Sequence, residues 1–178
     1  MPFELQPTLT GDLVELRPLR EDDYDALYAV ASDPLIWEQH PVRDRWKADV
    51  FRDEFFRGAI DSGGAFAAID RAAGRIVGSS RYHDYREETS EVEIGWTFLA
   101  RSHWGGRYNG EMKRLMLTHA FRFVDRVVFS VGVTNFRSQK AVEKIGGVRV
   151  GSKVDARGRE SVVFAITAES FARQPQPS

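Results

Sequence analysis

The chain has 178 residues, 42% of them hydrophobic, a formal net charge of −1 at pH 7 and no cysteine. This length suits a single domain with a buried core, and the nearly balanced charge argues against nucleic acid as a partner. The absence of cysteine excludes disulfides, thiolate zinc sites and a cysteine nucleophile. No apolar run reaches the roughly 18 residues of a membrane-spanning helix, so we expect a cytoplasmic protein with no membrane partner.

Hydrophobic periodicity predicts seven strands and four helices. In chain order they are a strand at 13–16, helices at 21–32 and 47–60, strands at 65–69, 76–82 and 91–99, a helix in the second part of 100–124, a strand at 127–133, a helix at 138–145, and strands at 148–154 and 160–166. Three consecutive strands followed by a helical crossover indicate an α+β fold. We expect one domain over 1–172 and a frayed tail over 173–178.

Between the first two helices, residues 35–46 form an aromatic and polar stretch that reads as a loop. Trp37, Glu38 and His40 place large rings beside acidic and titratable groups, as in the walls of small-molecule pockets. The alternative is that the tryptophans of this loop cap the core. The four histidines of the chain are scattered without metal-ligand spacing, so we predict no metal site.

The strand at 91–99 is apolar at Val92, Ile94, Trp96 and Phe98, which is the period of a strand. It runs into a polar, glycine-dense turn and then into an amphipathic helix. The first turn of a helix has backbone N–H groups without intrahelical partners and carries the positive end of the helix dipole, so phosphate is a natural ligand there. A tight connection without a ligand is the alternative.

Two segments, EIGWTFLARSHWGGRYNGE and TNFRSQKAVEKIGG, together with the element order, resemble the GNAT superfamily of acyl-CoA-dependent N-acyltransferases across essentially the whole chain. Within it they look most like the branch of the bacterial ribosomal-protein alanine N-acetyltransferases. The resemblance implies a mixed, mostly antiparallel central sheet of about seven strands flanked by about four helices. It also implies acetyl-CoA as co-substrate and no metal.

In that family the turn follows the pattern Q/RxxGxG/A, and its backbone N–H groups hold the pyrophosphate of CoA. Here Arg107 and Asn109 stand where the family has glycine and glycine or alanine, so Arg107 either adds a bond to phosphate or points outwards. The strand end is expected to hold pantetheine along its free backbone edge, and an NxxS element follows the next strand; Asn135 could alternatively be a plain helix cap. The residues expected to bind CoA are Phe98, Leu99, Ala100, Trp104, Gly105, Gly106, Arg107, Tyr108, Asn109, Gly110, Asn135 and Ser138.

Acyl transfer to an amine needs a base for the amine and an acid for the leaving thiolate. By the resemblance, Glu93 is the candidate base, with a surface glutamate like Glu91 as the alternative. Many relatives have a tyrosine acid seven residues after the Asn of the motif, but that position is Val142 here, which leaves Ser138 as the candidate acid. The candidate acceptor contacts are Trp37, Glu38, His40 and Tyr82.

The resemblance implies an N-acetyltransferase that moves acetyl from acetyl-CoA to a primary amine by direct attack in a ternary complex. The acceptor would be a protein N-terminus, a peptide or a small-molecule amine. The alternative is a domain that binds CoA or acyl-CoA without catalysis, as a sensor or scaffold. Dimers are common in the family, so a homodimer is a further expectation.

Overall fold

The computed structural model describes residues 2–175. Its sheet has the order β1-β2-β3-β4-β5-β6-β8-β7, and every described pair of neighbours is antiparallel except β5 and β6. The strands are β1 (Leu9–Thr10), β2 (Val14–Pro18), β3 (Ala65–Asp70), β4 (Arg75–Arg86), β5 (Glu91–Leu99), β6 (Arg126–Gly132), β7 (Val148–Val154) and β8 (Glu160–Thr167). The predicted α+β class with a mostly antiparallel mixed sheet is confirmed.

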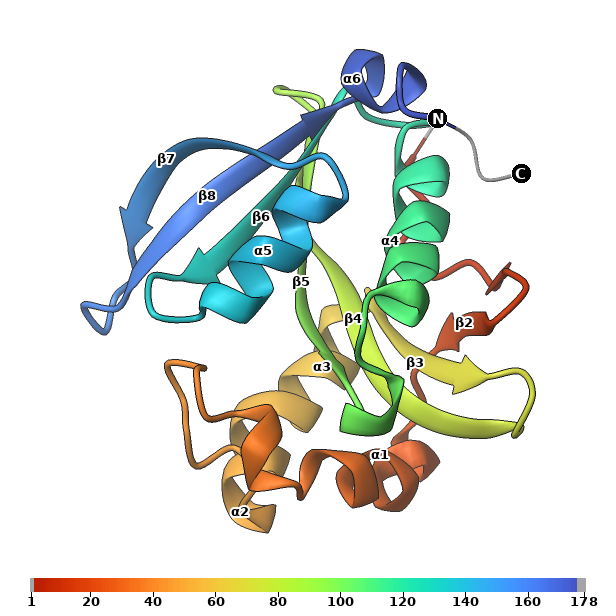
Figure 1. Ribbon diagram of the computed structural model, residues 1–178, viewed down its shortest axis with the longest axis vertical. Helices are drawn as coiled ribbons and strands as arrows, with labels where there is room; N and C mark the ends of the chain where they lie inside the picture. Colours follow the sequence, from red (N-terminus) through yellow and green to blue (C-terminus); the bar gives the residue numbers. More distant parts are fainter. Residues whose placement is uncertain (1, 176–178) are drawn as a thin grey trace.

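The helical segments cover both faces of this sheet (Figure 1). They are η1 (Glu21–Asp23), α1 (Tyr24–Ala31), η2 (Pro34–Ile36), α2 (Ala48–Phe51), η3 (Arg52–Phe56), α3 (Arg57–Ser62), η4 (Arg101–His103), α4 (Arg107–Ala120), α5 (Phe136–Lys144) and α6 (Ala168–Ala172). The expected helix at 47–60 is the continuous run α2, η3 and α3. None of the helices within residues 2–175 is long and apolar enough to cross a bilayer.

Four elements were not predicted: β1, α6 and the short helices η2 and η4. β1 has two residues, too few to show alternation, and it brings the sheet to eight strands instead of the predicted seven. α6 has five residues. Thr167 accepts a hydrogen bond from the Ser170 N–H and caps α6. In the tail, Gln174 donates to the Ile145 carbonyl, and residues 176–178 of the predicted frayed tail lie outside the described residues.

Alternation along β3 divides the core in two. Phe66 and Ala68 belong to the cluster under α4 and α5, whereas Ala65 and Ala67 belong to the cluster under α1 to α3. The prediction that the apolar residues of β5 share one face of the strand is wrong beyond Ile94. Val92 and Ile94 lie in the α4 cluster, but Phe98 lies in the α1 cluster.

A bulge in β5 explains this change of face. The register between β4 and β5 shifts between Ser79 and Arg81, opposite Gly95 and Phe98, and Trp96 has a φ of +55°. One extra residue in a strand reverses which side chains face which way. After the bulge, Leu99 takes the place in the α4 cluster that the alternation would give to Phe98.

β5 and β6 are paired over only three residue pairs. Their parallel register runs from Glu91 opposite Arg126 to Glu93 opposite Val128, and beyond that point the strands diverge (Figure 1). In the figure, α4 lies on the β5 side of the divergence and α5 on the β6 side. The far half of β5 therefore has no strand partner on this edge among the described residues.

A buried lysine supports the bulge from the α4 side. Lys113 is 4% exposed, and its Nζ donates to the hydroxyls of Ser80, at 3.1 Å, and Thr97. Burial lowers the pKa of Lys113 to about 7 from its ordinary value of 10.5. Since no carboxylate in residues 2–175 forms an ion pair with Lys113, its charge is poorly compensated in the fold.

Lys113→Met is therefore expected to raise the free energy of unfolding at neutral pH by about 1–4 kcal/mol. Between pH 7 and 10.5 the unfolded chain keeps the Lys113 proton while the folded protein loses it, so the wild-type free energy of unfolding rises with pH in this window. Urea unfolding at several pH values should show that the free energy of unfolding rises less steeply with pH in Lys113→Met than in the wild type. A control, Lys140→Met on the exposed face of α5, should keep the wild-type slope; equal slopes in all three proteins would contradict this reading.

Candidate functional site

The glycine turn between η4 and α4 has the backbone of an anion site. Gly105 and Gly106 have φ values of +112° and +98°, which side chains other than glycine rarely adopt. The first bond of α4 runs from the Gly110 N–H to the Gly106 carbonyl at 2.8 Å, and no described side chain caps this end of the helix. The N–H groups at 107–109 therefore precede the first bond of the helix and have no side-chain cap among the described residues, and phosphate binding at this turn stays a prediction.

Two sets of side-chain contacts fix this turn in place. The Glu111 carboxylate, in the first turns of α4, accepts the backbone N–H groups of residues 12–14 at 2.7 to 2.9 Å. His103 Nε2 lies 2.9 Å from Asp70 Oδ2 at the end of β3, and this bond lowers the pKa of Asp70. The start of α4 is therefore held against both β2 and β3 before any ligand binds.

A cation from another helix lies at the turn. A side chain built on Gly106 would collide with Lys144 Nζ, which reaches over from the end of α5. Lys144 was not among the predicted residues, because nothing in its local sequence relates it to a turn 38 positions away. Arg107, the predicted extra cation, is exposed. Backbone donors and a lysine thus converge at Gly106.

The end of β5 is partly occupied by contacts within the protein. The Ala100 N–H donates to the Val77 carbonyl of β4 at 2.8 Å, so this amide is not free for a ligand. Backbone groups alternate in direction along a strand, so Leu99 faces the diverging edge; its carbonyl accepts from the Trp104 indole at 3.0 Å. The Arg137 guanidinium stacks on that indole at 4.0 Å, joining β5 to α5. Of the predicted Phe98 to Ala100 segment, Leu99 is the residue that offers backbone to the opening.

The NxxS element begins α5. The Asn135 side chain accepts the Ser138 N–H at 3.3 Å, which is the helix-cap geometry considered for it from the sequence. Asn135 is buried and Ser138 is partly exposed, so the hydroxyl is the more accessible group. Val142, at the position of the family tyrosine, lies in the core. No acid comes from that position, and Ser138 stays the candidate.

Glu93 lies at the last residue pair before β5 and β6 diverge. Its carboxylate is buried, with Lys153 Nζ of β7 3.3 Å from one oxygen and His83 Nε2 of β4 3.8 Å from the other. A side chain at Gly95 would come within 2.9 Å of His83 Nε2, so the glycine makes room for the imidazole. Glu91, the comparison residue, instead lies 3.3 Å from Arg126 in an ion pair. The two glutamates therefore have different surroundings.

His83 also lies 3.0 Å from Asp84, and ligand atoms of His83, Asp84 and Glu93 are all within 4.8 Å of one another. The scattered histidines of the sequence hid this grouping, because Glu93 joins it from the next strand. By distance alone the three could hold a metal ion, but Lys153 already pairs with the Glu93 carboxylate. We assign no metal to this group.

Two of the four predicted acceptor contacts lie in the core. Tyr82 is 1% exposed and donates its hydroxyl to the Met116 carbonyl, and Trp37 is 3% exposed and donates its indole to the Ala31 carbonyl at 2.8 Å. Trp37 thus occupies the core-capping position that the sequence left as an alternative. We do not retain either as an acceptor contact. Glu38 is exposed and lies 3.5 Å from Arg137.

His40 stays neutral in this loop. Its Nδ1 accepts the Val42 N–H at 2.9 Å, and its Nε2 lies 3.3 Å from the Arg45 guanidinium. Burial, followed by the charge of Arg45, lowers the pKa of His40 to about 3. A neutral imidazole whose Nδ1 is used as acceptor carries its proton on Nε2. This ring is therefore unsuited to take a proton near neutral pH.

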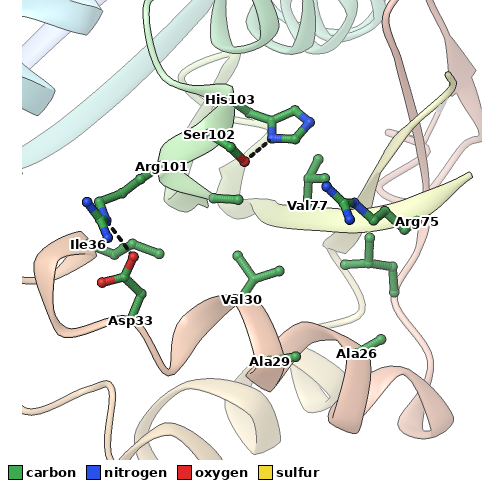
Figure 2. Close-up of a pocket in the computed structure, with 12 residues that line it drawn as sticks. Ala26, Ala29, Val30, Asp33, Ile36, Arg75, Val77, Arg101, Ser102 and His103 are labelled. Atoms are coloured by element: carbon green, nitrogen blue, oxygen red, sulfur yellow. Dashed lines mark hydrogen bonds and ion pairs between the residues drawn. The ribbon is translucent and has the colours of Figure 1, made fainter. Parts of the chain in front are cut away.

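An open pocket of about 720 Å³ lies on the α1 side of the turn. Figure 2 shows its wall: α1 contributes Ala26, Ala29 and Val30, and Arg101 of η4 reaches Asp33 at the end of the helix. The Arg101 guanidinium lowers the pKa of Asp33. The pocket adjoins Ala100 to His103, immediately before the glycine turn, but the helix N-terminus and Lys144 do not line it.

A family model described as an acetyltransferase (GNAT) domain matches residues 14–148. A search of curated proteins found no match. Among solved structures, a GCN5-related N-acetyltransferase from Brucella melitensis is 20% identical over 96% of this chain and 83% of its own, with a TM-score of 0.83. RimJ from Mycobacterium smegmatis, in complex with CoA-disulfide, is 21% identical over 94% and 90%, with a TM-score of 0.71.

Spermidine N-acetyltransferase from Vibrio cholerae, in complex with CoA and spermine, is 16% identical over 92% of this chain and 100% of its own, with a TM-score of 0.67. At these identities the structural likeness shows a shared fold over nearly the whole chain.

Proposed function

The chain belongs to the GNAT acetyltransferase family, and from that premise we propose that it transfers acetyl to a primary amine, on a protein or peptide N-terminus or on a small molecule. Membership makes it an acyl-CoA-dependent acetyltransferase with acetyl-CoA as co-substrate. The amine as acceptor draws support from the relative solved with CoA and spermine. The resemblance of the two sequence segments to the ribosomal-protein branch, and RimJ among the similar folds, favour an N-terminal amine.

One observation carries the proposal: the glycine turn at the start of α4 follows the half of β5 that has no pairing with β6. A diphosphate fits the first, because free N–H groups and Lys144 meet there. An extended amide chain fits the second, because an unpaired strand edge presents N–H and C=O groups in register. When bound, acetyl-CoA supplies an activated acetyl thioester.

The residues of this chain would then do three things. The turn and the β5 edge would hold the donor in one orientation, and fixing two reactants in line is worth roughly 7–11 kcal/mol of the barrier. Glu93 would accept the proton of the incoming amine, directly or through water. Ser138, or a water that it holds, would return a proton to the leaving thiolate. Attack in a ternary complex needs no covalent intermediate on the protein, in keeping with a chain that has no cysteine.

The test is release of free thiol from acetyl-CoA in the presence of an amine panel, comprising peptides with free N-termini, amino acids and polyamines. We expect acceptor-dependent thiol release, together with a rise in melting temperature when CoA is added. A rise in melting temperature without thiol release for any amine would favour the alternative, a CoA-binding domain without catalysis. The absence of both thiol release and a rise in melting temperature would refute the proposal.

Lys144 offers a separate check on the diphosphate position. Lys144→Met is expected to raise the Kd for CoA about tenfold, since charge-assisted hydrogen bonds contribute about 1.5 kcal/mol or more. The loss should shrink at high salt, which screens exposed charges. Calorimetric titration measures both. Lys140→Met, one turn earlier on α5, is the matched control; an equal effect of both substitutions would mean that only the net charge of the helix matters.

A further inference from the structure

Two buried arginines share the aromatic rings beside the β5 bulge. Arg45, from the loop after η2, and Arg81, from β4, are each 5% exposed. Their guanidinium carbons lie 5.2 and 4.3 Å from the centre of the Trp96 ring. Phe55 of η3 contacts both, at 5.7 and 5.6 Å. Two positive charges are thus held against the same rings in the interior.

These charges lack an anionic partner. Within residues 2–175 no carboxylate forms an ion pair with Arg45 or Arg81, and the Nε of each is buried without a hydrogen bond. Arg81 donates to the Phe55 carbonyl at 3.3 Å. Within residues 2–175, the polar atom at hydrogen-bond distance from the Arg45 guanidinium is His40 Nε2, which carries a hydrogen and cannot accept. Burial lowers the pKa of each arginine to about 10.

The acids near Arg45 do not neutralise it. Glu54 and Asp44 act on Arg45 through space, but neither forms an ion pair with it. Glu54 lies 3.8 Å from Arg157 of the β7–β8 turn. Arg159, on the same turn, adds a further positive charge that acts on both His40 and Arg45. Burying an uncompensated charge costs several kcal/mol. A ligand that brings a negative group would relieve that cost.

The elements that carry the two arginines contact both strands that diverge, β5 and β6. Arg81 pairs with Gly95, two residues after Glu93. The loop that carries Arg45 packs against the end of β6, where a side chain at Gly132 would collide with Pro41. Its Gln39 accepts the backbone N–H of Arg137 in α5. Arg81 is therefore paired with β5 close to the candidate base, and the loop of Arg45 packs against the end of β6 and the start of α5.

Trp96 covers the cluster from solvent. Trp96 is 37% exposed, whereas the two guanidinium groups that lie against its ring are buried. The φ of +55° at Trp96 is unusual for a bulky residue and strains the backbone at this position. Such strain tends to persist at ligand-binding positions. The bulge thus places an exposed aromatic ring over two cations that have no carboxylate partner within residues 2–175.

We propose that Arg45 and Arg81 recognise a carboxylate that the acceptor carries near its reactive amine, an inference that rests on the proposed function for the identity of the acceptor. The planar guanidinium fork matches a carboxylate in geometry. The acceptor class is then an acidic amine, such as a peptide N-terminus followed by an acidic residue. Polyamines, which carry only positive charge, are disfavoured.

Matched acceptors test this preference. Peptide amides Ser-Glu-Ala and Ser-Gln-Ala, and 5-aminopentanoate with its amide, differ only in the negative charge. We expect kcat/KM about tenfold higher for each charged member, mainly through KM. In Arg45→Met and Arg81→Met the ratio should fall to about one, whereas Arg43→Met, an exposed arginine of the same loop, should keep it. A wild-type ratio near one, or a ratio that survives both buried substitutions, would overturn the proposal.

A second experiment measures binding alone and does not depend on catalysis. Glutarate should raise the melting temperature of the wild type and glutaramide should not, and the shift should be lost in Arg45→Met and Arg81→Met. A larger shift with inorganic phosphate that is lost in Arg45→Met and Arg81→Met would overturn the carboxylate class, because phosphate bound at the glycine turn does not depend on these arginines. Arg81→Lys, which keeps the charge but loses the fork, is the second variant if a methionine variant fails to fold, and it should give a reduced shift. Glutarate binding without acetylation of any amine would refute the proposed function but not this inference. Acetylation without a preference for charged acceptors, and without a shift in melting temperature on adding glutarate, would refute only this inference.

Discussion

Glu93→Gln is expected to lower kcat about 100-fold or more, the usual loss when a general base is removed, while the Kd for CoA stays unchanged. Glutamine keeps the size of the side chain, but its amide cannot accept the proton of the amine. The carboxylate is buried at the last β5–β6 pair and is held by Lys153 at 3.3 Å. Its environment is thus that of a positioned group in the opening. Steady-state kinetics with a saturating acceptor, combined with calorimetric titration of CoA, measures the two effects separately.

Glu91→Gln is the matched control. Glu91 lies two residues earlier on the same strand, but it pairs with Arg126 and Arg86 away from His83 and Lys153. We expect this variant to retain wild-type kcat. Equal losses of kcat in both variants, or a parallel loss of CoA affinity and thermal stability in Glu93→Gln, would assign Glu93 a structural role in the sheet.

Gly106→Val is expected to raise the Kd for CoA about 100-fold or more, because two effects act together. A β-branched residue is strained at the φ of +98° that Gly106 adopts. Its side chain would also displace Lys144 Nζ and cover the free N–H groups of α4. Losing two or more bonds to a charged group, each worth about 1.5–3 kcal/mol, accounts for this magnitude. Calorimetric titration of CoA into the variant measures this Kd.

Gly110→Ala separates the turn from the helix that follows it. A side chain at Gly110 would meet nothing within 4 Å, and the residue lies inside α4. Alanine there should leave the Kd for CoA unchanged and stabilise the fold by about 0.5–1 kcal/mol through helix propensity. Similar losses of CoA affinity in both glycine variants would place the diphosphate elsewhere along α4.

Local patterns in the sequence determined most of the fold. The strands at 91–99 and 148–154 agree with β5 and β7 at both ends, because alternation and flanking turn residues mark them. The glycine turn was predictable for the same reason, since the donors of a helix N-terminus come from consecutive residues. β4 runs on to Arg86, beyond the predicted end at residue 82, because pairing with β5 extends it through a polar segment.

Tertiary contacts explain what the sequence left undetermined. Lys144 reaches the turn from α5, and Lys153 reaches Glu93 from β7, over separations that no local motif spans. Tyr82 was expected at the acceptor site, but it packs in the cluster under α4 and donates to the Met116 carbonyl, a contact between distant residues that no local motif shows. The buried partners of Arg45 and Arg81 are aromatic rings, which a charge pattern does not predict.

The most direct test of the account is a crystal structure of the protein with CoA. We predict diphosphate oxygens within hydrogen-bond distance of the backbone N–H groups at the start of α4 and of Lys144 Nζ, with pantetheine along β5 where it leaves β6. A diphosphate bound in the open pocket between α1 and β4 (Figure 2), with the glycine turn free of ligand, would contradict the account.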